Sequence, residues 1–205
     1  IYLPMVPEAL VAMLACTRIG AVHSVGFSAF SADALKSRIQ DGQAKILITA
    51  GGYYRRGKEI SLLEKAEEAA KKTTAKKIIV VSRLGKKHNH LDFNKELKKA
   101  SQDCEPEIMN SEDMMFILYT SGTTGKPKGV IHDTGGYAVQ SYFTAKWDFN
   151  LRDNDVFWCT ADVGWVTGHT YAFYGPLLNA STTLIYEGSP DFPDIGRWWK
   201  IIQNN

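Results

Sequence analysis

The most informative stretch of the chain is Tyr119-Thr120-Ser121-Gly122-Thr123-Thr124-Gly125-Lys126-Pro127-Lys128-Gly129. An apolar run over residues 115–120 predicts a strand that leads directly into it. Its glycines let the backbone approach a ligand closely, and its hydroxyls, free N–H groups and lysines can all donate to phosphate oxygens. The alternative is a flexible surface turn, which the preceding strand and the order of the residues disfavour. The stretch therefore predicts a phosphate-binding loop.

This loop differs from the P-loop of kinases and GTPases. A P-loop needs Gly-Lys followed at once by Ser or Thr. Here Pro127 follows Gly125 and Lys126. Proline would prevent the helix whose N-terminus holds phosphates in P-loop proteins. A kinase or GTPase function is therefore not predicted.

Around the loop, apolar runs alternate with amphipathic segments. This order is typical of an α/β fold built of layered βαβ units with mostly parallel sheets. Strands are predicted at residues 1–3, 21–27, 45–49, 77–81, 115–120, 130–132, 155–160 and 182–187, and helices at 4–20, 31–41, 60–72, 135–146 and 194–205. The polar, basic stretch 82–110 interrupts the alternation and predicts a surface loop or subdomain boundary. Its His88 and His90 are interpreted as solvated.

Composition narrows the functional classes. The formal net charge is only +2, from 24 basic and 22 acidic residues, so neither nucleic acid nor a membrane surface is an expected partner. Three separated cysteines indicate free thiols in a reducing compartment, which favours the cytoplasm, and no metal site follows from their spacing or from that of the histidines. Because Ile1 and Asn205 fall within a predicted strand and a predicted helix, we expect a fragment of a larger domain.

The loop at 119–129 resembles the signature loop of the adenylate-forming superfamily, which includes acyl-CoA synthetases and peptide-synthetase adenylation domains. The resemblance implies that this chain is part of an N-terminal AMP-binding domain, with the C-terminal domain absent. It implies ATP, Mg²⁺ and CoA as substrates or cofactors, and catalytic roles for Thr120 and Lys126. The residues implied to bind the ATP phosphates are Thr120, Ser121, Gly122, Thr123, Thr124, Gly125 and Lys126.

Four further stretches resemble the acetyl- and propionyl-CoA synthetase branch of that superfamily. They cover residues 2–25, 158–169, 174–177 and 187–190. This resemblance implies an acetate–CoA ligase, which forms acetyl-AMP and pyrophosphate from acetate and ATP and then a thioester with CoA. A propionate or other short-chain acyl-CoA ligase is the alternative. A non-catalytic nucleotide- or CoA-binding module is a third reading, and the oligomeric state stays open.

The same branch resemblance suggests substrate-binding residues. It places Trp165, Val166 and Thr167 at the wall of the acyl pocket, with Thr167 also near the CoA chain. A β-branched pair beside an indole would make a small, stiff pocket, and threonine at 167 favours acetate over propionate. The residues implied to bind CoA are Arg55, Arg56, Lys58, Thr167 and Asp191. Lys58 stands where the branch has a second arginine, and Asp191 where relatives often have asparagine.

Overall fold

The computed structural model describes residues 1–120 and 127–205. Its first half contains α1 (Pro7–Arg18), α2 (Ala32–Asp41), β1 (Ile46–Ala50), β2 (Gly52–Arg55), β3 (Lys58–Ser61), α3 (Leu63–Ala70), β4 (Lys77–Val81), β5 (Leu91–Asp92) and α4 (Phe93–Lys99). Its second half contains β6 (Met114–Thr120), β7 (Lys128–Asp133), α5 (Thr134–Asp148), β8 (Val156–Trp158), α6 (Val166–His169), the π-helix η1 (Thr170–Tyr174), α7 (Gly175–Leu178), β9 (Thr182–Leu184) and α8 (Arg197–Asn204).

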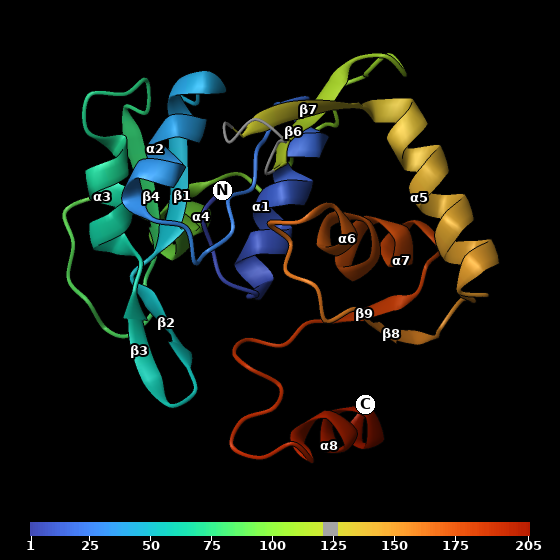
Figure 1. Cartoon of the computed structure of the whole chain (residues 1–205). Helices are drawn as coiled ribbons and strands as arrows, with labels where there is room; N and C mark the ends of the chain where they lie inside the picture. Colours follow the sequence, from blue (N-terminus) through green and yellow to red (C-terminus); the bar gives the residue numbers. More distant parts are fainter. Residues whose placement is uncertain (121–126) are drawn as a thin grey trace.

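A parallel sheet of strand order β1-β4-β5 forms the centre of the first half. Tyr2 adds a single parallel bridge to Thr49 of β1. The helices α2 and α3 contact each other beside this sheet, and α1 lies between the sheet and the second half of the chain (Figure 1). In the second half β8 and β9 also pair in parallel. The predicted α/β architecture with parallel sheets is therefore confirmed.

Two antiparallel hairpins complete the strands. The first is β2–β3, which lies where the sequence predicted a loop and the start of a helix over 60–72. The second is β6–β7, in which Thr120 stands opposite Lys128. The strand predicted at 21–27 is wrong in extent, because only His23 forms a bridge there, to Phe116. Side-chain pattern predicts an extended conformation, whereas strand pairing depends on which neighbour lies alongside.

The core joins both halves of the chain. One cluster of buried apolar side chains includes Tyr2, Leu47, Phe116, Val163 and Phe173. In the second half, the helical run from α6 through η1 to α7 packs against α5. No helix of the described residues is both long and apolar enough to cross a bilayer. The subdomain boundary predicted near 82–110 stays a prediction.

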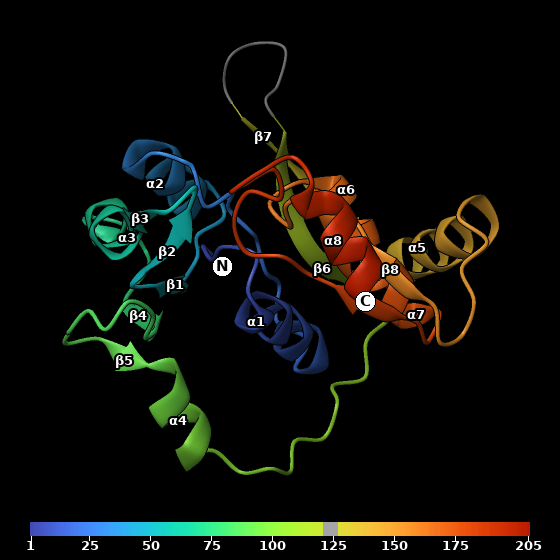
Figure 2. The same cartoon turned by 90° about the horizontal axis from the view of Figure 1, so that it is seen from below.

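The segment between α4 and β6 is extended and runs along the outside of the molecule (Figure 2). It is tied to the end of α1 at two points. The Glu107 main-chain N–H donates to the Arg18 carbonyl at 2.8 Å, and Arg18 Nε donates to the Cys104 carbonyl at 2.7 Å. This segment carries the chain from one half of the molecule to the other.

Candidate active site

A cavity of about 350 Å³, called here the first cavity, opens between the two halves of the chain. The first half contributes Pro4, Met5, Phe27, Ser28, Tyr53 and Arg55, and the second half Trp158, Cys159, Thr160, Ala161, Asp162, Trp165, Tyr186, Gly188 and Pro190. Arg55 of the predicted CoA site and Trp165 of the predicted acyl pocket therefore face the same space. The cavity combines one guanidinium, one carboxylate and several aromatic rings.

The turn from Asp162 to Gly168 builds one wall of this cavity. Asp162 Oδ1 accepts the Gly164 main-chain N–H at 2.7 Å, and its carbonyl accepts the Trp165 N–H at 3.0 Å. Glycine is required at 168 because a Cβ there would lie 1.9 Å from the Asp162 carbonyl oxygen. The turn is therefore held in one shape by its own backbone, and it presents Trp165 at 5.8 Å from the Phe27 ring.

The Asp162 carboxyl has a perturbed pKa. Burial raises this pKa from 3.8 to about 6, against the opposing effects of the Gly164 N–H and the Arg55 charge. Near neutral pH the group is mostly ionised and close to its titration range. A carboxyl of this kind can accept a hydrogen bond from a ligand and can exchange a proton in the same place.

A second cavity, of about 530 Å³, lies on the other side of α6. Its lining consists of Ile131, His132, Asp133, Gly136, Tyr137, Gln140, Val166, Thr167, Thr170 and Tyr171. The Asp133 carboxylate caps α5 by accepting the Tyr137 N–H at 3.1 Å. The Tyr137 hydroxyl lies 3.0 Å from Thr170 Oγ1. Val166 and Thr167 therefore line a different space from Trp165, although the sequence placed all three in one wall.

The predicted phosphate loop is described only at its base. Thr120 is the last residue of β6 and is exposed, while Ser121, Gly122, Thr123, Thr124, Gly125 and Lys126 lie outside the described residues. Next to Thr120, the Tyr119 hydroxyl donates to Asp41 Oδ2 of α2 at 2.7 Å. Burial and this hydrogen bond raise the pKa of Tyr119. The end of β6 is thus attached to the first half of the chain.

The remaining predicted CoA residues meet at the tip of the β2–β3 hairpin. Arg56 Nη2 and Asp191 Oδ2 form an ion pair at 2.6 Å. Lys58 stands opposite Arg55 in the hairpin register and is exposed. The hydrogen bond from Ser189 and the Arg56 charge lower the pKa of Asp191 despite partial desolvation. The structure therefore brings Arg55, Arg56, Lys58 and Asp191 to the same end of the molecule, with Arg55 inside the first cavity.

Comparison with known proteins places this geometry in a family. The profile described as "AMP-binding enzyme" matches residues 1–205. The chain belongs to the AMP-binding enzyme family. Curated relatives named acetyl-coenzyme A synthetase are 53% identical to it in Pyrobaculum aerophilum and 51% identical in Helicobacter pylori strain G27, and each match covers 99% of this chain. The chain spans 32% of the length of these relatives.

A solved structure of this family has the same fold. The acetoacetyl-CoA synthetase from Streptomyces lividans superposes with a TM-score of 0.91 and 30% sequence identity, covering 98% of this chain and 31% of that one. At that identity the agreement extends beyond general architecture. The resemblance to the adenylate-forming superfamily that the loop suggested is confirmed.

Within this AMP-binding domain, His169 is the last residue of α6 and lies in the core beside the candidate site. It is fully buried, stacks at 6.3 Å on His23 and lies 4.8 Å from the Phe116 ring. Burial lowers the pKa of His169 to about 4, so the ring is neutral at physiological pH. Main-chain groups of Trp165 and Val163 face the ring and oppose this shift. The role of His169 is to pack the end of α6 onto the core.

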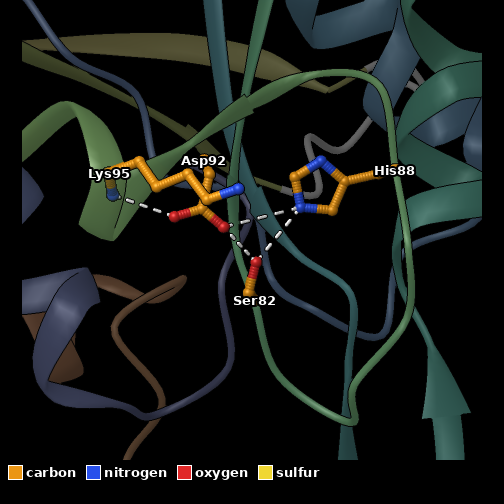
Figure 3. Close-up of polar contacts among 4 residues, drawn as sticks. All are labelled: Ser82, His88, Asp92 and Lys95. Carbon is orange, nitrogen blue, oxygen red and sulfur yellow. Dashed lines mark hydrogen bonds and ion pairs between the residues drawn. The ribbon is translucent and has the colours of Figure 1, made fainter.

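A Ser–His–Asp group also occurs, away from both cavities (Figure 3). Ser82 Oγ donates to the Asp92 carboxylate and lies 3.2 Å from His88 Nε2, and Asp92 Oδ1 accepts the Lys95 main-chain N–H at 2.9 Å. A catalytic triad needs the acid and the hydroxyl on opposite ring nitrogens. Here both face Nε2, so the group caps α4. The interpretation of His88 as solvated is wrong, because its side chain is only 7% exposed.

Sequence reasoning missed most of the first cavity. Cys159 and Asp162 lie in the 158–169 stretch but were given no role, and Tyr186 lies outside the four stretches; all three line the cavity. Phe27 and Ser28 also line the cavity, and Ser28 is buried.

Proposed function

We propose that the protein carrying this chain is an acetate–CoA ligase that forms AMP. Acetate attacks the α-phosphorus of ATP to give acetyl-AMP and pyrophosphate, and the CoA thiol then displaces AMP to give the thioester. The main support is that curated relatives about 50% identical over nearly the whole chain are named acetyl-coenzyme A synthetase. Because this chain spans 32% of those relatives, the activity is proposed for the full-length protein.

The placement of the two cavities fits this reaction. Trp165 lines the first cavity and the next residue, Val166, lines the second. We assign the first cavity to CoA, with Arg55, Arg56 and Lys58 supplying charge for its phosphates. We assign Val166 and Thr167 to the acyl group. The thiol and the acyl carbon would then meet across a single turn, which is the positioning that a group transfer needs.

Assigning the first cavity to CoA specifies the roles expected of Asp191, Lys58 and Thr167. Asp191 neutralises Arg56 at 2.6 Å, so Arg55 and Lys58 would supply most of the positive charge for CoA. Lysine offers a point charge rather than the bidentate fork of arginine. Thr167 would contact the acyl group from the second cavity.

ATP binding is assigned to the loop from Thr120 to Lys126, and Mg²⁺ would enter with ATP. Among residues 1–120 and 127–205, no three His, Cys, Asp or Glu side chains come together to hold a metal ion. The metal when bound would neutralise phosphate charge. This chain would contribute hydroxyls, N–H groups and the Lys126 ammonium to the same triphosphate. A cytoplasmic location is part of the proposal.

The proposal is tested by assaying the two half-reactions of the full-length protein separately. Acetate-dependent exchange of pyrophosphate into ATP reports adenylation, and CoA-dependent consumption of preformed acetyl-AMP reports thioester formation. Lys126→Ala should slow the first about 100-fold, the usual scale for removing one electrostatic contact to a transition state. The second should be nearly unchanged, since it involves no triphosphate.

Three results would each overturn a part of the assignment. Absence of exchange with acetate and with every other short carboxylate would exclude the ligase and favour a non-catalytic binding module. A higher kcat/KM for propionate than for acetate would replace acetate by propionate as the substrate. Equal damage to both half-reactions by Lys126→Ala would mean that Lys126 supports the fold.

A further inference from the structure

The far wall of the first cavity is the irregular segment from Tyr186 to Asp191, called here the strap. Figure 1 shows the chain between β9 and α8 turning toward the β2–β3 hairpin. The side chains of the strap alternate. Tyr186, Gly188 and Pro190 line the cavity, whereas Glu187 pairs with Arg83 and Asp191 pairs with Arg56. The strap therefore has the first cavity on one side and its two ion pairs on the other.

The two attachments differ in burial. The Arg56–Asp191 pair has side chains 60% and 35% exposed, so solvent screens it. The Arg83–Glu187 pair has side chains 29% and 23% exposed. A shielded pair resists rearrangement, because separating it would leave a charge without a partner in a poorly solvated place. Arg83–Glu187 is therefore the firmer attachment.

A second carboxylate, that of Glu8 in the first turn of α1, lies close enough to Glu187 to act on its charge. Burial raises the pKa of Glu187, with Glu8 adding to the rise and Arg83 opposing it. Arg83 Nε, Glu187 Oε1 and Glu8 Oε2 are buried and have no hydrogen-bond partner among the described residues. The Arg83 guanidinium therefore pairs with Glu187, a residue far away in the sequence, next to a second carboxylate that disfavours an unpaired charge on Glu187.

The backbone of Arg83 is itself fixed to the parallel sheet. Its N–H donates to the carbonyl of Val81, the last residue of β4, at 2.8 Å. The Gly51 N–H donates to the same carbonyl at 3.1 Å. A Cβ at Gly51 would lie 2.7 Å from the Arg83 carbonyl oxygen, so β1 and Arg83 approach closely. Through Arg83, the strap is therefore attached to the parallel sheet.

We infer that Arg83 and Glu187 are positioning residues for CoA: they hold the strap at the distance from Trp165 that lets the first cavity grip this substrate. Neither side chain lines the cavity, so neither contacts the ligand. The inference rests on the proposed function, which assigns CoA to the first cavity. It adds that CoA affinity depends on the Arg83–Glu187 ion pair behind the strap.

The test uses Glu187→Gln in the full-length protein, with CoA binding measured by calorimetry in the presence of a non-reactive acyl-adenylate analogue. We expect the Kd for CoA to rise about 10-fold, a smaller loss than the roughly 100-fold that a 1 Å misplacement can cost in catalysis. Acetate-dependent pyrophosphate exchange should stay within about twofold of wild type. Arg83→Gln should weaken CoA binding at least as much, and Arg83→Lys should recover part of the loss.

Two control variants separate positioning from general stability. Lys71→Gln breaks the exposed 2.6 Å pair with Glu68 and should leave CoA binding unchanged. Leu47→Ala removes a buried side chain of β1 far along the sheet from the strap, and should lower the melting temperature without a selective change in CoA affinity.

The outcomes separate this inference from the proposed function. Wild-type protein with no acyl-dependent exchange would contradict the proposed function. Wild-type protein that exchanges pyrophosphate but does not bind CoA, or a Glu187→Gln variant with unchanged CoA affinity, would overturn the positioning role. Equal losses in exchange and in CoA binding, matched by Leu47→Ala, would also overturn it, because the ion pair would then only support the fold.

Discussion

The two cavities differ in chemistry although one short turn separates them. The first contains the Arg55 guanidinium, the Asp162 carboxylate and several aromatic rings, and it lies between the two halves of the chain. The second contains Val166 and Thr167 and is lined only by residues of the second half. The start of α6 turns consecutive side chains to opposite sides. Substitutions in neighbouring residues should therefore affect different substrates.

The largest effect on stability is expected at Gly168, because its close contact with the Asp162 carbonyl shapes the turn that adjoins both cavities. Gly168→Ala would place a Cβ 1.9 Å from the Asp162 carbonyl oxygen, so the turn and α6 must separate. We expect the free energy of unfolding to fall by about 3 kcal/mol or more, the range of severe overpacking. Chemical denaturation of the full-length protein measures it. Gly26→Ala is the matched control, since its Cβ would meet nothing closer than 3.5 Å. Equal stability of the two variants would contradict the shared contact.

A change in the first cavity alone is expected from Trp165→Ala. The indole forms a wall beside Phe27, and its removal should raise the KM for CoA about 10- to 100-fold, as for loss of a stacking and packing contact at the centre of a site. The KM for acetate in pyrophosphate exchange should change less than about threefold. A larger effect on acetate than on CoA would mean that Trp165 serves the acyl pocket, as the sequence first suggested.

The charge of the first cavity predicts a pH-dependent stability. The pKa of Asp162 rises from 3.8 to about 6 on folding, mainly through burial. A raised carboxyl pKa favours the protonated form in the folded state, so its contribution to stability is lost as pH rises through this window. Asp162→Asn removes the buried charge and keeps an acceptor for the Gly164 N–H.

We expect Asp162→Asn to be about 1–2 kcal/mol more stable than wild type near pH 8, after allowing for partial solvent exposure. The difference should shrink as pH falls below the pKa of about 6. Thermal unfolding at a series of pH values measures both variants under matched conditions. A difference that grows at acidic pH would show that the carboxylate stabilises the fold.

The smallest effect is expected in the second cavity. Val166→Ala enlarges the pocket by two methyl groups, so the ratio of kcat/KM for propionate to that for acetate should rise about 10-fold, the low end of the range for one methylene. Parallel rate measurements with acetate, propionate and butyrate give the ratio, and the KM for CoA serves as the control. An unchanged ratio would remove Val166 from the acyl pocket.

Local patterns in the sequence were enough to predict the fold class and the family of the protein. The order of apolar runs predicted the α/β architecture, because parallel strands are usually connected through helices and both elements are marked by local patterns. The stretch from Tyr119 to Gly129 determined the family, because its glycines, hydroxyls and lysines are needed at fixed spacing for one chemical task. The resemblance also predicted Arg55 as a CoA-binding residue and Trp165 as a wall of the acyl pocket, and both line the first cavity.

The packing of the folded chain sets which cavity each of these residues lines. Trp165 and Val166 adjoin in sequence, yet they line different cavities because α6 begins between them. Arg83 and Glu187 are far apart in sequence and no motif links them, yet packing joins them behind the cavity wall. Motifs reveal chemistry that is confined to one segment. Cavities and buried charge clusters arise where distant segments meet, so their composition follows from the packing of the whole chain.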